Sequence, residues 1–273
     1  MLTSLFQNAP DVRFKVFLIH EALSDKCQSH IQAICDKYNH SFTPLTASHQ
    51  ALPNVPILEH TKIASYLRLL ATHLLPEDLD RVLYLDADLI VRADLSPFYF
   101  QDLGNNYVAA IAQHPVQGRS ERLGMDPAVE YFNAGVLLIN LDLWRAEDLG
   151  NRTLQFAIDN ADAIEMADQD ALNGTCDGRV LLSSQRYNAG EWVFHDFSAE
   201  ELATTPSELE RARTDPAIAH YTGSSKPWDG SSPHPFAHEY FVYLKRTLYY
   251  GRKHKIKRLR IKGQQLLRKL MLR

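Results

Sequence analysis

Two aspartates separated by one residue are the strongest chemical signal in the 273-residue sequence. Asp86 and Asp88 follow the apolar run VLYL at residues 82–85, which predicts a buried strand ending at the first aspartate. Residues two apart on a strand point to the same side, so both carboxylates can face one divalent cation. A D-x-D pair is common by chance, and the strand before it is what makes this one informative. We expect the pair at the carboxyl end of a sheet strand, where α/β proteins bind ligands.

A metal held by these carboxylates suits the transfer of a sugar from a nucleotide diphosphate. The departing diphosphate is doubly charged, and a cation that bridges its phosphates stabilises the developing charge. An oxygen-rich shell with one imidazole favours Mn²⁺, or Mg²⁺, over zinc. His220 ends the apolar run at residues 217–221 and is the best candidate for the imidazole. The alternative is an ordinary core histidine.

Three further segments carry groups that bind phosphates or sugars. In the loop YTGSSKPW, Gly223 lets the backbone approach a phosphate and Lys226 supplies a positive charge. In YFNAG, Asn133 can hold sugar hydroxyls, although a turn before a strand is the alternative. Asp168 and Gln169 begin a predicted helix, where an acidic residue is also an ordinary cap.

Alternating strand and helix patterns predict an α/β sheet that is covered on both faces. The expected strands are residues 11–19, 81–85, 108–112, 136–141, 180–183 and 217–221. The expected helices are residues 24–38, 61–75 and 152–164. Ser24 can cap the first of these helices, and Pro76 would end the second. The polar segment 194–216, with a helix start at residues 204–206, is either an excursion over the active face or a solvated helix and loop.

Charge divides the chain into two parts. The formal net charge is −4, yet residues 251–273 hold ten basic residues and no acidic one, while residues 1–250 hold 19 basic and 33 acidic residues, a charge of −14. This predicts a domain at residues 1–250 and a separate tail at 251–273. The chain has no apolar run of membrane-spanning length and no signal-peptide pattern, so we expect a cytoplasmic protein. Its three cysteines lack zinc-site spacing and are expected to be reduced thiols.

The chain strongly resembles glycosyltransferase family 8, the group containing bacterial lipopolysaccharide galactosyl- and glucosyltransferases. The resemblance rests on four motifs that occur together and in this order: VLYLDAD, EYFNAGVLLINLDLWR, DQDALN and HYTGSSKPW. The resemblance runs from about Val12 to Trp228. It implies a GT-A fold, Mn²⁺ dependence, a UDP-sugar donor and retention of anomeric configuration. We therefore expect a hexosyltransferase that acts on lipopolysaccharide or another surface glycan.

The resemblance also assigns roles to residues. It makes Asp86, Asp88 and His220 the metal ligands and places Gly223 and Lys226 on the diphosphate. Arg68, in a Y-x-R pattern, would meet the donor sugar or phosphate. The expected substrate contacts also include Ala87, Asn133 and Ala134, and the expected catalytic residues are Asp168 and Gln169. Gln169 would lie where a double-displacement nucleophile is expected, but an amide is a poor nucleophile. Same-face transfer, in which the leaving phosphate accepts the acceptor's proton, is therefore the expected route.

Two departures from the family pattern bear on function. Family members usually open with a strand of the type I-V-F-A-x-D-x-N-Y that binds the nucleoside, whereas this chain begins within the helix that follows it, near SLFQNAP. That omission should uncover strand edges. It reflects either a start placed too far downstream or an inactive remnant that acts only as a binding protein. Gln113 stands where relatives often carry an acidic residue, which leaves glucose and galactose both open.

Apolar residues recur at near-helical spacing among the cations of the tail: Ile256, Leu259, Leu266, Leu267, Leu270 and Met271. Such a helix can lie in the headgroup plane of an anionic cytoplasmic leaflet, and the tail resembles the basic, membrane-associating C-termini of lipopolysaccharide family members. The apolar stripe and the lack of interleaved aromatic residues argue against nucleic-acid binding. A merely solvated tail remains the alternative.

Overall fold

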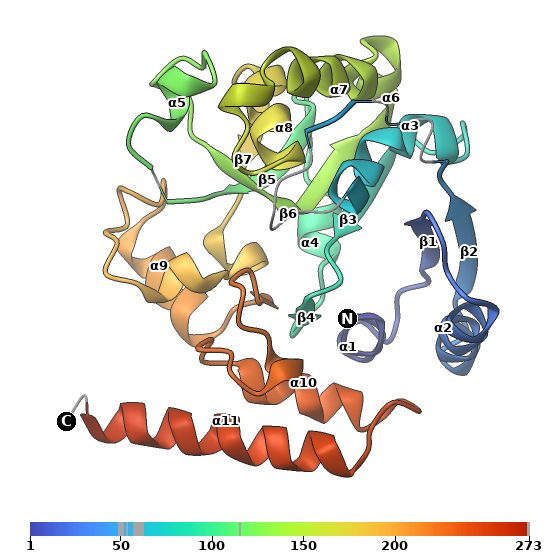
Figure 1. The fold of residues 1–273 in the computed structure, drawn as a ribbon, viewed down its shortest axis with the longest axis vertical. Coiled ribbons are helices and arrows are strands. Elements are labelled where there is room, and N and C mark those ends of the chain that lie inside the picture. The colour runs from blue at the N-terminus through green and yellow to red at the C-terminus, as the bar shows by residue number, and fades with distance from the viewer. Residues whose placement is uncertain (49–51, 53, 57–62, 115, 272–273) are drawn as a thin grey trace.

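A four-stranded mixed sheet forms the centre of the computed structural model, which describes residues 1–48, 52, 54–56, 63–114 and 116–271. The strand order is β3-β6-β5-β7 (Figure 1). The strands are β3 (Arg81–Leu85), β5 (Val108–Ala112), β6 (Phe132–Asn140) and β7 (Val180–Leu182). The long, buried β6 runs antiparallel to both β3 and β5, and β5 runs parallel to β7.

The alternation of side chains along the strands divides the core into two layers. In β5, Val108 and Ala110 enter one hydrophobic cluster, whereas Ala109 and Ile111 enter another on the opposite face. Four helices cover the first face: α3 (Ala71–Leu74), α6 (Leu141–Ala146), α7 (Leu149–Asp159) and α8 (Asp168–Cys176). Three helices cover the second face: α1 (Leu2–Asn8), α2 (Asp25–Lys37) and α4 (Ser96–Tyr99). The predicted α/β sheet covered on both faces is confirmed.

The strands β1 (Lys15–His20) and β2 (Ser41–Thr46) form a separate parallel pair. Phe17 packs with the first cluster and Val16 with the second, so the pair continues the same two layers. Among the described strands, β1 bonds only to β2 and β3 only to β6, which leaves both with an unpaired edge. The apolar residues of β3 are half-buried, whereas those of β5 are fully buried.

A short antiparallel pair, β4 (Leu89–Val91) and β8 (Ile218–His220), links the centre of the chain to its later part. The run at residues 217–221 was predicted as a strand, but β4 was not, because three residues directly after a D-x-D motif give no periodicity. η4 (Gln185–Asn188) lies next to β8, and α9 (Pro206–Thr214) contacts both η4 and η5 (Glu191–Phe194). Leu209 of α9 is buried in a small cluster with Trp192 of η5.

Most predicted boundaries hold within a few residues. The hydroxyl of Ser24 caps α2 by accepting from Cys27 N, and Thr205 caps α9 by accepting from Glu208 N. The predicted helix 61–75 is a 3₁₀ helix, η2 (Ile63–Leu70), followed by α3, and residues 61–62 lie outside the described part. The predicted helix 152–164 is α7, which begins earlier at Leu149, and then η3 (Ala161–Ala163). The three cysteines are free thiols, as expected.

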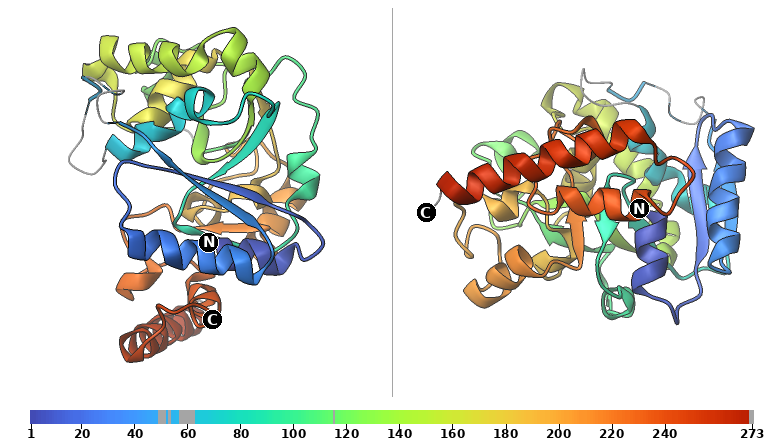
Figure 2. Two further views of the ribbon diagram at one scale, coloured as in Figure 1. Left: turned by 90° about the vertical axis from the view of Figure 1, so that its right-hand side faces the viewer. Right: turned by 90° about the horizontal axis from the view of Figure 1, so that it is seen from below.

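The last two long helices lie at one end of the molecule (Figures 1 and 2). α10 (Ala237–Leu244) packs between the body and α11 (Arg252–Met271), and η6 (Pro227–Asp229) also contacts α11. Ile261 of α11 is fully buried beside Phe241 and Tyr221, so the basic tail is attached through an apolar contact. Within the described residues, no helix is both long enough and apolar enough to cross a bilayer.

Candidate active site

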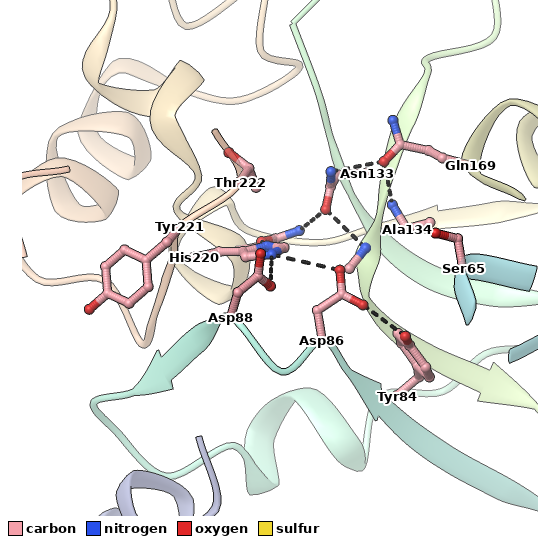
Figure 3. Close-up of polar contacts among 12 residues, drawn as sticks. Ser65, Tyr84, Asp86, Asp88, Asn133, Ala134, Gln169, His220, Tyr221 and Thr222 are labelled. Atoms are coloured by element: carbon pink, nitrogen blue, oxygen red, sulfur yellow. Dashed lines mark hydrogen bonds and ion pairs between the residues drawn. The ribbon is translucent and has the colours of Figure 1, made fainter. Parts of the chain in front are cut away.

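Three potential metal ligands meet where β3, β4 and β8 come together. Asp86 directly follows β3, Asp88 directly precedes β4, and His220 ends β8 (Figure 3). Pairing of β4 with β8 sets His220 opposite Leu89, one residue past Asp88. One ligand atom from each side chain lies within 4.8 Å of the others, with His220 Nε2 3.1 Å from Asp88 Oδ1 and 3.7 Å from Asp86 Oδ2. The three predicted ligands are therefore brought together.

Hydrogen bonds orient the Asp86 carboxylate. Its Oδ1 accepts from the hydroxyl of Tyr84 at 2.7 Å and from the guanidinium of Arg68 at 3.2 Å. Oδ2 is the oxygen on the His220 side. Partners that hold one oxygen of a ligating carboxylate fix the direction of the other, which raises the affinity of a metal site.

The imidazole of His220 is oriented by Asn188, a residue that the sequence analysis missed. Its Nδ1 lies 2.7 Å from Asn188 Oδ1, an acceptor, so a neutral ring carries its proton on Nδ1 and presents the Nε2 lone pair to the aspartates. Asn188 Nδ2 in turn donates to Asn133 Oδ1 at 2.8 Å. The tripeptide Asn-Ala-Gly occurs at residues 133–135 and again at 188–190, and this repeat was the available signal.

Asp88 is held by two cationic or potentially cationic groups. Lys226 donates to Asp88 Oδ2 at 2.6 Å, and His220 lies on Oδ1. Burial raises the pKa of this carboxyl, but hydrogen bonding and positive charge, from His220 when its ring is protonated on both nitrogens and from Lys226, outweigh burial and hold the pKa well below its usual range. Asp88 is therefore ionised at any pH at which the protein would work.

Glycine at position 135 makes room for these ligands. A Cβ there would lie 2.3 Å from His220 Cε1, 2.6 Å from Asp86 Oδ2 and 3.0 Å from Asn133 Oδ1. Two carboxylates and one imidazole, each oriented by a neighbour and packed around a residue without a side chain, fit a divalent cation.

A cluster of side-chain amides lies beside the ligands. Gln169 Oε1 accepts from Asn133 Nδ2 at 2.9 Å and from Ala134 N at 3.0 Å, and its Nε2 donates to Gln113 at 3.0 Å and to the Tyr131 hydroxyl at 3.0 Å. Asn133 lies within β6, so the alternative of a turn before the strand is wrong. Buried polar backbone and side-chain bonds override the turn tendency of its sequence. The amides of Asn133 and Gln169 are thus engaged with the protein itself.

Asp168 forms a buried ion pair with Arg68. Asp168 Oδ2 lies 2.8 Å from Arg68 Nε, but this Nε–H donates to the carbonyl of Ser65 at 3.3 Å, so the contact with Asp168 is an ion pair without a hydrogen bond. Burial raises the pKa of Asp168 to about 7, and the charge of Arg68 opposes that rise. Asp168 itself does not cap α8, because Ala167 is the N-cap residue and its side chain accepts no hydrogen bond; Asp168 and Asp170 both lie in the first turn.

The remaining predicted contacts lie around this centre. Ala87 is exposed between the two aspartates, and the carbonyl of Ala134 accepts from Arg68. At Gly223, a Cβ would meet the Glu191 carboxylate at 2.4 Å. In this conformation the space expected for a phosphate on that side of Gly223 is taken by a carboxylate.

The fold and the site define a class: a GT-A-type glycosyltransferase with three potential metal ligands at the carboxyl end of a sheet strand. A sequence profile for "Glycosyl transferase family 8" matches residues 1–231, and the chain belongs to this family. The chain is 26% identical over 251 residues to the lipopolysaccharide 1,2-glucosyltransferase of Escherichia coli K12, covering 90% of this chain and 73% of that protein. It is 24% identical to the lipopolysaccharide 1,3-galactosyltransferase of Salmonella typhimurium, covering 89% of this chain and 72% of that protein.

A solved structure shares the fold. The galactosyltransferase LgtC, in complex with donor and acceptor sugar analogues, superposes with a TM-score of 0.82 at 27% identity, covering 94% of this chain and 95% of LgtC. The predicted GT-A fold is confirmed.

Proposed function

We propose that this glycosyltransferase moves a hexose, glucose or galactose, from a UDP-sugar to lipopolysaccharide or another surface glycan, with retention and with Mn²⁺ or Mg²⁺ bound. The observation that carries the proposal is the convergence of Asp86, Asp88 and His220, each with an orienting partner. The two relatives named above act on lipopolysaccharide, which supports the acceptor class.

The residues around the ligands suit a departing diphosphate. A divalent cation at the three ligands supplies positive charge to the phosphates. The Lys226 ammonium, 2.6 Å from Asp88, adds a second positive charge on the same side, and Arg68 adds a third beside Asp86. Fixed charges of this kind stabilise a leaving group without reorganisation.

The surroundings of the two expected catalytic residues support transfer without a covalent sugar on the protein. The Gln169 amide oxygen already accepts two hydrogen bonds, and Asp168 faces Arg68. Both act as positioning groups in this proposal, and the leaving phosphate takes the proton of the acceptor hydroxyl on the same face.

We also propose that α11 holds the protein on the anionic inner face of the cytoplasmic membrane. Ile256, Leu259 and Leu266 are 64%, 69% and 61% exposed, whereas Ile261 is fully buried against the body. The helix thus has an inner apolar contact and a separate outer apolar stripe among cations. The side chains of Leu267, Leu270 and Met271 lie outside the described residues.

The test is hydrolysis and transfer with UDP-glucose and UDP-galactose, with and without Mn²⁺. We expect metal-dependent activity that Asp88→Ala abolishes and that Asp162→Asn, a change at an exposed aspartate, leaves intact. The anomer of the product, read by proton NMR, reports retention or inversion. A sugar trapped covalently on Asp168 or Gln169 would overturn same-face transfer. Absence of donor binding with Mn²⁺ present would instead support the binding-only alternative.

A further inference from the structure

Arg119, on the short helix α5 (Arg119–Arg122), is a buried cation without an anionic partner among the described residues (Figure 1). The residue is 8% exposed, and its guanidinium carbon lies 4.2 Å from the centre of the Tyr131 ring. Neither Nε nor NH1 has a hydrogen-bond partner in the part of the chain that the structure describes. A buried charge that lacks an anionic partner is costly, and a negatively charged ligand would supply that partner.

The carboxylate bound to Tyr131 does not serve as that partner. Asp170 Oδ1 accepts from the Tyr131 hydroxyl at 2.6 Å, and its Oδ2 accepts from the backbone amides of Glu165 at 2.8 Å and Met166 at 2.9 Å. Among the described residues, the guanidinium that pairs with Asp170 is that of Arg122, at 3.6 Å. Asp170 thus stabilises the start of α8 and is not paired with Arg119.

His114 adds a second unsatisfied group in the same region. Its Nδ1 is buried and has no hydrogen-bond partner among the residues whose structure is described. Its ring stacks on Phe197 with centroids 4.8 Å apart. Burial lowers the pKa of His114, and the charges of Arg119 and His195 lower it further. The ring is therefore neutral near pH 7 and can donate one hydrogen bond from Nδ1.

Both groups adjoin the amide cluster of the candidate site. Tyr131, under the Arg119 guanidinium, bonds to Gln169, and Gln113, next to His114 in sequence, bonds to both Gln169 and Asn133. We propose that Arg119 and His114 bind a negatively charged substituent, a carboxylate or a phosphate, on one of the two sugars that meet at this site. The forked guanidinium matches either group. The inference rests on the proposed function, because that function brings the sugars to this cluster.

Calorimetry on the full chain with Mn²⁺ tests the inference in two arms. The donor arm compares UDP-glucuronate with UDP-glucose; the acceptor arm compares glucose 6-phosphate with glucose while UDP is present. We expect the anionic compound to bind at least about tenfold more tightly in one arm, which identifies the sugar that carries the charge. Arg119→Gln should remove this preference. Arg122→Gln, on the same helix but already paired with Glu165 at 3.1 Å, should keep it.

Equal affinity for the anionic and the neutral compound in both arms would overturn the inference, and this comparison needs only the native protein. A preference that persists in Arg119→Gln would also overturn it. Failure of the proposed function would give a different result. Neither UDP-sugar would then bind, whereas the affinities for glucose 6-phosphate and glucose could still be compared.

Discussion

The Cα atom of Gly135 lies so close to His220 that a methyl group on it would come within 2.3 Å of the imidazole Cε1. The same methyl group would come within 2.6 Å of Asp86 Oδ2. Close-packed interiors do not absorb such overlaps without moving their neighbours. Glycine in the middle of β6 is therefore required by two candidate metal ligands, His220 and Asp86, whose side chains approach the strand backbone.

Gly135→Ala should weaken Mn²⁺ binding by about tenfold or more, because displacing a ligand by a fraction of an ångström spoils the coordination geometry. Titration of Mn²⁺ followed by electron paramagnetic resonance measures the affinity directly. Gly263→Ala is the matched control, since a Cβ on Gly263 meets nothing within 4 Å. Equal Mn²⁺ affinity in the two variants would show that His220 and Asp86 do not share a metal.

Asn188→Ala should lower Mn²⁺ affinity by about 10- to 100-fold, the usual effect of removing a partner that orients a ligating histidine. The change leaves His220 Nδ1 without its acceptor, 2.7 Å away in the native protein, so the ring is free to rotate or change tautomer. Asn188→Asp keeps an acceptor at that position and should recover most of the affinity. Failure of the aspartate to rescue binding would argue that Asn188 acts only through its bond to Asn133.

The sequence predicted the three candidate metal ligands because Asp86 and His220 stand at the ends of short apolar runs and Asp88 follows Asp86 by two residues, a pattern that needs no tertiary information. The sequence did not predict the role of Asn188, because its hydrogen bond to His220 joins residues 32 positions apart. The repeated tripeptide Asn-Ala-Gly was the one local pattern that pointed to it. The start of β6 was placed too late, at Val136, because Asn133 and Gly135 read as turn residues. Contacts with Gln169 and Asn188 override that local tendency, and a propensity argument cannot include them.

The fold shows the same division between local and long-range information. Caps such as Ser24 and Thr205 were predictable because cap and first turn lie within four residues of each other. The 3₁₀ geometry of η2 was not, since a 3₁₀ and an α-helix share the same apolar spacing over a few residues. The unpaired nitrogens of Arg119 could not be predicted either, because they depend on which carboxylates are already engaged by other groups.

Arg68→Lys should lower kcat/KM for the UDP-sugar by about 100-fold while the charge of the site stays the same. The guanidinium reaches Asp86 at 3.2 Å, Asp168 at 2.8 Å and the carbonyl of Ala134, which a single ammonium cannot do. Because one ammonium cannot replace all of these contacts, the free energy of unfolding should also fall. Arg81→Lys, at a half-exposed pair with Asp80, is the control and should change neither quantity appreciably.

His234 should make stability depend on pH below neutrality. Burial lowers its pKa from 6.5 to about 4, so the unfolded chain binds a proton in this range that the folded protein does not. The contribution to stability is present above pH 6.5 and is lost as the pH falls toward 4, by about 3 kcal/mol in total. Urea unfolding of the native protein and of His234→Gln at pH 7, 5.5 and 4.5 measures the difference. Parallel pH profiles for the two proteins would contradict the assignment.

The outer stripe of α11 should bind anionic bilayers. Replacing Ile256, Leu259 and Leu266 by glutamine leaves every charge in place and removes only the exposed apolar side chains. Each buried apolar side chain contributes about 1.5–3 kcal/mol to such binding, so the triple variant should lose most of its affinity for vesicles of phosphatidylglycerol.

Co-sedimentation with phosphatidylglycerol and with phosphatidylcholine vesicles separates the two contributions. The native protein should prefer the anionic vesicles and should dissociate as salt is raised, because cations near a charged surface act within a Debye length of about 10 Å. Sugar transfer to a water-soluble acceptor should be unchanged in the triple variant, since the stripe faces away from the buried Ile261 that anchors α11 to the body. Undiminished sedimentation of the triple variant would mean that charge alone holds α11 to the vesicle, and would remove the apolar stripe from the membrane proposal.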